Sequence, residues 1–195
     1  FVYAGPSFAG SVMRGLSNRA ASDPKRIVFP EGDDPRVVRA ARILVDENIA
    51  NPILLGREKK VREVAKTVGV SLEGVVLRDP ATSPHVDTYA RALWTRRQRK
   101  GITLSEARAR MAQPVYYGCM MLAAGDADAL VAGEEMNYPD TIRPALETIG
   151  VADAQQAVCG IYMMILHQDT YFCADCTVNI APDARESDLR LLLVS

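Results

Sequence analysis

The stretch KRIVFPEGDDPRVVRAARILVDENIANPILLG, residues 25–56, alternates between two kinds of hydrophobic pattern. Residues 27–29 form a short apolar run of the kind found in a buried strand. Pro35 follows a polar turn and suits a helix start, where its missing N–H is not needed. Apolar residues then recur at helical spacing over residues 36–47, and residues 53–55 are apolar again. The stretch therefore predicts a strand, a helix and a second strand.

The same alternation continues further along the chain. Residues 57–69 form an amphipathic pattern that ends at Gly69, in the usual position just after a helix. Residues 75–77 and residues 127–132 are a third and a fourth strand-like run. Short buried strands that alternate with helices are typical of a mostly parallel sheet covered by helices on both faces. The predicted fold class is therefore α/β.

Three helices are expected between the third and fourth strands. The first covers residues 83–100. Thr103 and Glu106 have the spacing of a capping box, which predicts that the second helix begins there. Pro114 opens the third helix, which is more apolar.

The pattern changes after Gly150, where a further helix is expected to end. Residues 157–166 and 170–180 are predicted strands, and the residues between them give hairpin spacing, which favours an antiparallel pair. Residues 183–195 have the pattern of a helix that is cut short.

We therefore expect three parts in the chain. Residues 1–22 are a linker or leading helix, and residues 23–150 are a first α/β domain. Residues 151–195 are the beginning of a second α/β domain, which is truncated.

Composition and charge argue against several classes of function. The formal net charge is -1 and aromatic residues make up 6% of the chain, so no nucleic-acid partner is expected. No apolar run approaches the ~20 residues that span a bilayer, so no membrane association is expected. The first residues also lack the pattern of a secretory signal. Four cysteines in a chain without an export signal indicate free thiols and a cytoplasmic location.

Arg143 is a candidate anion-binding residue. It lies beside Pro144, and a proline fits where a backbone donor is unused, so the helix is expected to start near Thr141. Asp140 or Thr141 would then cap the helix, and Arg143 would lie in its first turn. A helix N-terminus beside the carboxyl end of a strand is a natural site for a phosphate or carboxylate.

The alternative for Arg143 is a surface ion pair with Glu134 or Glu135, and spacing does not decide between the two interpretations. A basic cluster at residues 95–101 poses a similar question. Its cations, at the end of the helix of residues 83–100, are favoured there by the helix dipole, and a solvated face is the default interpretation. One of them could turn inward to a phosphate, and charge alone does not show which. The cluster consists of Arg96, Arg97, Arg99 and Lys100.

Two further motifs favour structural interpretations. The stretch EGDD, residues 31–34, could bind magnesium, but a solvated, acidic helix N-terminus is favoured.

Cys173 and Cys176 form a C-x-x-C motif inside a predicted strand, where the two side chains point to opposite faces. Zinc would need a second pair of ligands, and Cys119 and Cys159 are isolated. No metal is expected. Glycine-rich nucleotide loops and the G-x-S-x-G motif of serine hydrolases are also absent.

Six short stretches, in a fixed order along the chain, carry a family resemblance. They read KRIVFPEGDDPRVVRAA, ANPILLG, RRQRKGITLSEA, GCMMLAAGDADALVAG, YPDTIRPALETIG and YFCADCTVNIAPDA. Taken together, they resemble the phosphate acetyl/butyryltransferase family over almost the whole chain, from Lys25 onward.

The resemblance implies a fold, a reaction and a site. The family has two α/β domains of isocitrate/isopropylmalate dehydrogenase-like architecture and transfers an acetyl group between coenzyme A and phosphate in the cleft between them. Arg97 and Arg143 are then the residues that bind the phosphate portions of acetyl phosphate or coenzyme A, and Thr141 helps to orient the phosphate. The family's catalytic aspartate, with a serine and a further arginine, lies in a later segment, so no complete catalytic set is expected here. Acetyl-CoA or coenzyme A is the expected ligand, with no tightly bound cofactor.

The motif YPDTIRPAL, residues 138–146, and the stretch GIYM, residues 160–163, resemble one branch of the family more closely. This branch is the C-terminal domain of large NADP-dependent malic enzymes, in which another domain performs the oxidative decarboxylation. The expected function is therefore acetyl-CoA binding for allosteric regulation and assembly of a homo-oligomer. The alternative is the N-terminal portion of a phosphate acetyltransferase, and a third interpretation is a structural homologue that binds no acyl-CoA.

Overall fold

A computed structural model describes residues 8–151, 160–166 and 169–174 of the chain. The chain divides into two compact units, one of residues 18–150 and one that contains residues 1–17 and 151–195. Helix α1 (Phe8–Ala21) runs across the boundary in sequence between them. Among the described residues, no helix has the length and apolar character needed to cross a membrane.

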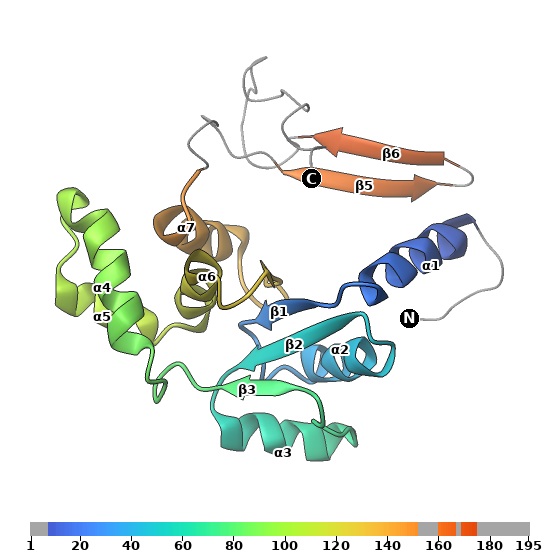
Figure 1. Cartoon of the computed structure of the whole chain (residues 1–195), viewed down its shortest axis with the longest axis horizontal. Helices are drawn as coiled ribbons and strands as arrows, with labels where there is room; N and C mark the ends of the chain where they lie inside the picture. Colours follow the sequence, from blue (N-terminus) through green and yellow to red (C-terminus); the bar gives the residue numbers. More distant parts are fainter. Residues whose placement is uncertain (1–7, 152–159, 167–168, 175–195) are drawn as a thin grey trace. The chain divides into compact units, whose positions relative to one another are not determined.

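The larger unit is built on a four-stranded sheet in which every neighbouring pair of strands is parallel (Figure 1). The strand order is β3-β2-β1-β4, so β1 lies inside the sheet and pairs with two strands that are distant in sequence. The predicted α/β class and parallel sheet are confirmed. The strands are β1 (Lys25–Phe29), β2 (Ala50–Leu55), β3 (Val76–Arg78) and β4 (Ala129–Leu130).

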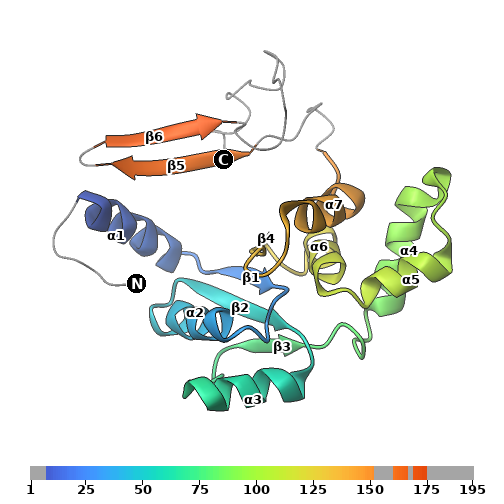
Figure 2. The ribbon, with the colours of Figure 1, turned by 180° about the vertical axis from the view of Figure 1, so that it is seen from behind.

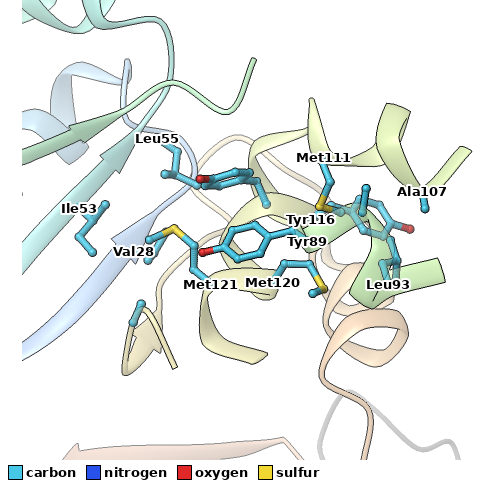
Figure 3. Close-up of a cluster of buried hydrophobic side chains, with 13 residues drawn as sticks. Val28, Ile53, Leu55, Tyr89, Leu93, Ala107, Met111, Tyr116, Met120 and Met121 are labelled. Carbon is cyan, nitrogen blue, oxygen red and sulfur yellow. The ribbon is translucent and has the colours of Figure 1, made fainter. Parts of the chain in front are cut away.

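Alternate residues of a strand face opposite sides of the sheet. Both faces of β2 are apolar, so helices cover the sheet on both sides. Leu54 packs with the helices α2 (Pro35–Asp46) and α3 (Glu58–Val68) in one core cluster. Ile53 and Leu55, its neighbours in β2, belong to a second cluster on the other side. This second cluster, drawn in Figure 3, is filled by α4 (Val86–Arg97), α5 (Leu104–Met111) and α6 (Pro114–Ala124). Figure 2 shows the same arrangement from behind.

Local signals in the sequence account for several helix ends. Asp34 caps α2 by accepting from the backbone N–H groups of Arg36 and Val37, at 2.7 and 3.3 Å. Gly69 ends α3 with a φ of 72°, as the sequence predicted. The predicted capping box between Thr103 and Glu106 is present at the start of α5.

Several predicted elements differ in extent from the observed ones, and two of the differences affect the region of the site. The predicted helix of residues 83–100 is α4 followed by a short 3-10 turn, η1 (Gln98–Lys100). The predicted fourth strand, residues 127–132, is reduced to the two residues of β4. The chain leaves the sheet early here because the backbone after β4 bonds to a side chain of another loop, as described below.

The predicted antiparallel hairpin is confirmed. Strand β5 (Ile161–Leu166) pairs with β6 (Asp169–Ala174), and Tyr162 lies opposite Cys173. The remainder of the second predicted strand, including Cys176, lies outside the described residues, as does the predicted helix of residues 183–195.

Gly32 provides a test of how tightly the loop after β1 packs on the sheet. Its N–H donates to the carbonyl of Leu55 at 3.1 Å, and an added Cβ would lie 2.5 Å from that oxygen and 2.8 Å from the Leu55 nitrogen. We expect Gly32→Ala to lower the free energy of unfolding by about 1–3 kcal/mol, because the backbone of an interior strand cannot move aside easily. Urea denaturation measures this change.

Gly15→Ala is the matched control, since nothing lies within 4 Å of a Cβ at this exposed position of α1. Alanine is favoured over glycine in a helix, so this variant should be as stable as the wild type or slightly more so. Equal stability of Gly32→Ala and the wild type would contradict the expected clash.

Candidate functional site

Helix α7 (Tyr138–Thr148), which carries Arg143, begins earlier than the sequence predicted. Its N-cap is Asn137, whose side chain makes no capping bond, so the prediction of a start near Thr141 with Asp140 or Thr141 as the cap is wrong. The helix contains two prolines, and Pro139 takes the position in the first turn where a missing N–H is harmless.

Pro144 lies inside the helix, and Arg143 lies in the second turn rather than in the first. The hydroxyl of Thr148 donates to the carbonyl of Pro144 at 2.7 Å. Arg143 therefore does not sit among the free N–H groups of a helix N-terminus, and its position on the face of the helix decides what it can contact.

The loop that leads into α7 is held by the buried carboxylate of Glu31. This carboxylate accepts hydrogen bonds from the backbone N–H groups of Gly133, Glu134 and Glu135, at 3.0, 3.0 and 2.7 Å. Burial alone would raise the pKa of Glu31, but these N–H groups favour the charged form and together lower the pKa below its ordinary value. These backbone donors at the strand end therefore bind a side chain of the protein itself and not an external anion.

The other carboxylates of the EGDD stretch also have protein partners. Asp34 caps α2, in agreement with the favoured interpretation of an acidic helix N-terminus. Asp33 pairs with Lys60 at 2.5 Å. Glu31 and Asp34 are both buried, so the expectation that this acidic stretch is solvated is wrong for these two residues. Within the described ranges, no group of three or more metal-ligating side chains is arranged to hold a metal ion.

The structure brings Arg97 and Arg143 together. Arg97, at the end of α4, and Arg143, on α7, line the same pocket of about 360 Å³. Glu147, one turn after Arg143, adds a carboxylate to its wall. The rest of the lining is apolar and comes from Pro139, Ile142 and Leu146.

Arg143 is exposed and forms no hydrogen bond or ion pair with any residue that the structure describes. The predicted alternative, pairing with Glu134 or Glu135, is wrong because Arg36 lies next to both. The guanidinium of Arg36 is 2.6 Å from the carboxylate of Glu134 and 4.0 Å from that of Glu135. Arg143 therefore keeps its donors available at the pocket wall.

Arg97 is only loosely paired. Its Nη2 lies 3.7 Å from a carboxylate oxygen of Glu147, which is longer than a direct hydrogen bond. Its Nε is buried and has no hydrogen-bond partner in the described part of the chain. Within the basic cluster, Arg96 binds the last carbonyl of α7, at Thr148, whereas Arg99 and Lys100 are exposed. The default interpretation, a solvated face, therefore holds for only part of this cluster.

Thr141 is not brought to the pocket. Its hydroxyl is buried and has no hydrogen-bond partner among the described residues, and Thr141 is not part of the pocket lining. Direct contact with a bound phosphate in this pocket has no geometric support for this residue.

Three residues that sequence reasoning missed form a hydrogen-bonded group that lines a pocket with Arg143. Glu147 accepts hydrogen bonds from the hydroxyl of Tyr116, at 2.8 Å, and from Arg110. Burial and this bond to Glu147 raise the pKa of Tyr116 to about 12, so its hydroxyl stays a neutral donor near neutral pH. The i,i+4 spacing of Arg143 and Glu147, which puts both on one helix face, was the only local signal for this group.

A second pocket, of about 520 Å³, adjoins the same residues. Arg110 and Tyr116 contribute to its lining. It shares three residues with the first pocket, namely Pro139, Arg143 and Glu147. Both pockets are built from the residues of the larger unit.

The larger unit is thus an α/β sheet whose covering helices bring two arginines to one pocket. A profile of the phosphate acetyl/butaryl transferase family matches residues 11–188, and the chain belongs to this family. It is 36% identical over 180 residues to phosphate acetyltransferase from Acetivibrio thermocellus, covering 89% of this chain and 54% of that protein. It is 34% identical over 171 residues to the Bacillus subtilis phosphate acetyltransferase, covering 88% and 53%.

Solved structures agree with these relatives. The fold resembles a phosphotransacetylase from Streptococcus pyogenes, with a TM-score of 0.84 at 32% identity over 91% of this chain and 54% of the other. It also resembles EutD phosphotransacetylase from Staphylococcus aureus, with a TM-score of 0.82 at 31% identity over 92% and 54%. The chain thus spans about half the length of these relatives.

Glu31 generates a prediction about stability and pH. We expect Glu31→Gln to lower the free energy of unfolding at pH 7 by about 1–3 kcal/mol, because three backbone donors lose a charged acceptor. The contribution of Glu31 is complete above the ordinary carboxyl pKa of about 4.3 and is lost as the pH falls through its lower folded-state pKa. The stability difference between variant and wild type should therefore shrink in acid.

Urea denaturation at a series of pH values from 7 to about 3 measures this difference. Glu63→Gln, at an exposed position of α3, is the control and should have little effect at any pH. A deficit of Glu31→Gln that stays constant down to the acid end would show that the carboxylate charge is not what holds the loop.

Proposed function

We propose that this chain is the part of a phosphate acetyltransferase that binds the phosphate groups of acetyl phosphate or coenzyme A. The observation that carries this proposal is the shared pocket of Arg97 and Arg143 in a chain of the phosphate acetyl/butaryl transferase family. In the full-length protein the reaction is acetyl transfer between coenzyme A and phosphate.

The state of the two arginines supports phosphate binding. A guanidinium presents several donors in a planar fork that matches phosphate oxygens, and such charge-assisted bonds are stronger than neutral ones. Arg143 has no partner within the described residues, and Arg97 has a buried Nε without one. A bound phosphate would therefore meet the unpaired guanidinium of Arg143, which lines the pocket.

These cations have a defined role in the proposed chemistry. When the coenzyme A thiolate attacks the carbonyl of acetyl phosphate, the bond to phosphate breaks and negative charge moves onto the leaving group. Preorganised cations stabilise that charge as it develops. The resemblance implies that the aspartate that takes the thiol proton lies in a later segment of the family's sequence. Arg97 and Arg143 are thus proposed to bind the ligand, and Thr141 is proposed to support α7 rather than to contact phosphate.

A second candidate is the acetyl-CoA-binding, regulatory domain of an NADP-dependent malic enzyme. The sequence YPDTIRPAL in α7, residues 138–146, favours it, because Tyr138 and Pro139 are bulky for a phosphate site. The relatives named above are phosphate acetyltransferases, so the comparisons favour the transferase. A homo-oligomeric state and a cytoplasmic location stay predictions from the sequence.

Binding and turnover measured together separate the two candidates. We expect the full-length protein to form acetyl-CoA from acetyl phosphate and coenzyme A, because the pocket supplies the cations that this reaction needs. A coupled acetyl-CoA assay measures turnover, and isothermal titration measures acetyl-CoA binding. Binding without turnover would instead favour the regulatory domain.

Substitution of Arg143 should have the largest effect on catalysis. We expect Arg143→Ala in the full-length protein to raise the KM for acetyl phosphate and to lower kcat. Loss of one charge-assisted contact should reduce kcat/KM by about 10- to 150-fold, equivalent to about 1.5–3 kcal/mol. Steady-state kinetics with varied acetyl phosphate measures both constants.

Arg99→Ala is the matched control, because Arg99 is exposed in the same basic cluster as Arg97 but does not line the pocket. It should leave kcat/KM almost unchanged. If both variants lose activity equally, general positive charge rather than this pocket binds the substrate.

A further inference from the structure

The two oxygens of the Glu147 carboxylate have different surroundings. Oε2 accepts from the Tyr116 hydroxyl at 2.8 Å and from the Arg110 guanidinium. Oε1 faces Arg97 across 3.7 Å and makes no direct hydrogen bond to it. The carboxylate is thus firmly held on one side and only loosely paired on the other.

The groups that hold Glu147 are themselves fixed. Tyr116 is 7% exposed and belongs to the core cluster drawn in Figure 3. The guanidinium of Arg110 lies 5.3 Å from the centroid of the Tyr116 ring, where a cation–π contact is favourable. Arg110 therefore cannot move away from the carboxylate without losing this contact as well.

A carboxylate that was not held in this way would compete for Arg97. The side chains of Glu147 and Arg97 are 15% and 22% exposed, so water screens their attraction only partly. Arginine and carboxylate groups this close tend to form a bidentate pair, which uses the same donors that a phosphate would bind. The observed separation of 3.7 Å shows that this tighter pair has not formed.

We propose that Arg110 and Tyr116 hold Glu147 back from Arg97, so that the Arg97 guanidinium remains free to bind a phosphate. The proposal rests on the proposed function of this pocket. Arg110 and Tyr116 are positioning residues, since they act on the ligand through Glu147 and Arg97.

The proposal predicts effects of opposite sign for two substitutions. Arg110→Gln releases Glu147 to pair with Arg97, so phosphate affinity should fall on the order of tenfold, the size of one lost charge-assisted contact. Glu147→Gln removes the competing charge, while its amide oxygen can still accept from Tyr116 and Arg110. Phosphate affinity should then rise, because no carboxylate competes with the phosphate for Arg97.

The double variant Arg110→Gln/Glu147→Gln provides the decisive comparison. Without the carboxylate, nothing competes for Arg97, so the double variant should regain the affinity that Arg110→Gln loses. General damage to the pocket would instead weaken all three variants. Tyr116→Phe removes one donor to Glu147 at nearly constant shape and should weaken phosphate binding in the same direction as Arg110→Gln.

The experiment is isothermal titration of the full-length protein with inorganic phosphate, with thermal unfolding to confirm that each variant is folded. Wild-type affinity in Arg110→Gln, or a double variant that binds as weakly as Arg110→Gln, overturns the proposal. If Arg110→Gln does not fold, the phosphate affinity of Tyr116→Phe is measured instead. An unchanged affinity in Tyr116→Phe then overturns the proposal.

Arg143→Ala separates this proposal from the proposed function. Unchanged phosphate affinity in Arg143→Ala shows that phosphate binds elsewhere, which overturns the assignment of the pocket and the role of Arg110 with it. Weaker binding in Arg143→Ala together with wild-type binding in Arg110→Gln leaves the pocket standing and removes only the role of Arg110.

Discussion

The candidate site depends on the contact between the Glu31 carboxylate and the backbone of the loop after β4. Three N–H groups of residues 133–135 bind this carboxylate, so the end of β1 is joined to the loop by charge-assisted hydrogen bonds. A buried carboxylate is tolerated only when such donors satisfy it. The loop runs directly into α7, so Arg143 and Glu147 owe their position to a residue more than a hundred positions earlier in the chain.

The sheet and its helices could be predicted from the sequence because their signals are local. Apolar runs of three residues, Gly69 after α3 and the Thr103–Glu106 capping box each act within a few residues. The length of β4 could not be predicted in this way. Its residues are apolar enough to continue as a strand, but Glu31 binds the backbone that follows and takes the chain out of the sheet.

The candidate site was predicted only in part, because its residues are brought together by contacts between distant parts of the chain. Family resemblance chose Arg97 from a cluster that charge could not resolve, and the structure places it in one pocket with Arg143. The expected helix N-terminus at Thr141 failed because one proline can mark a helix start and a second can lie inside the helix. Arg110, Tyr116 and Glu147 come from three different helices or their ends, and no spacing in the sequence reveals that they meet.

One face of α7 separates two cavities, and this has a consequence for how they work. Pro139, Arg143 and Glu147 line both cavities, so a molecule in either one constrains the same three side chains. Any effect that an occupant of one cavity has on the affinity of the other cavity must be matched by an equal effect in the reverse direction. More than two turns of α7, from Pro139 to Glu147, thus present one face to both cavities.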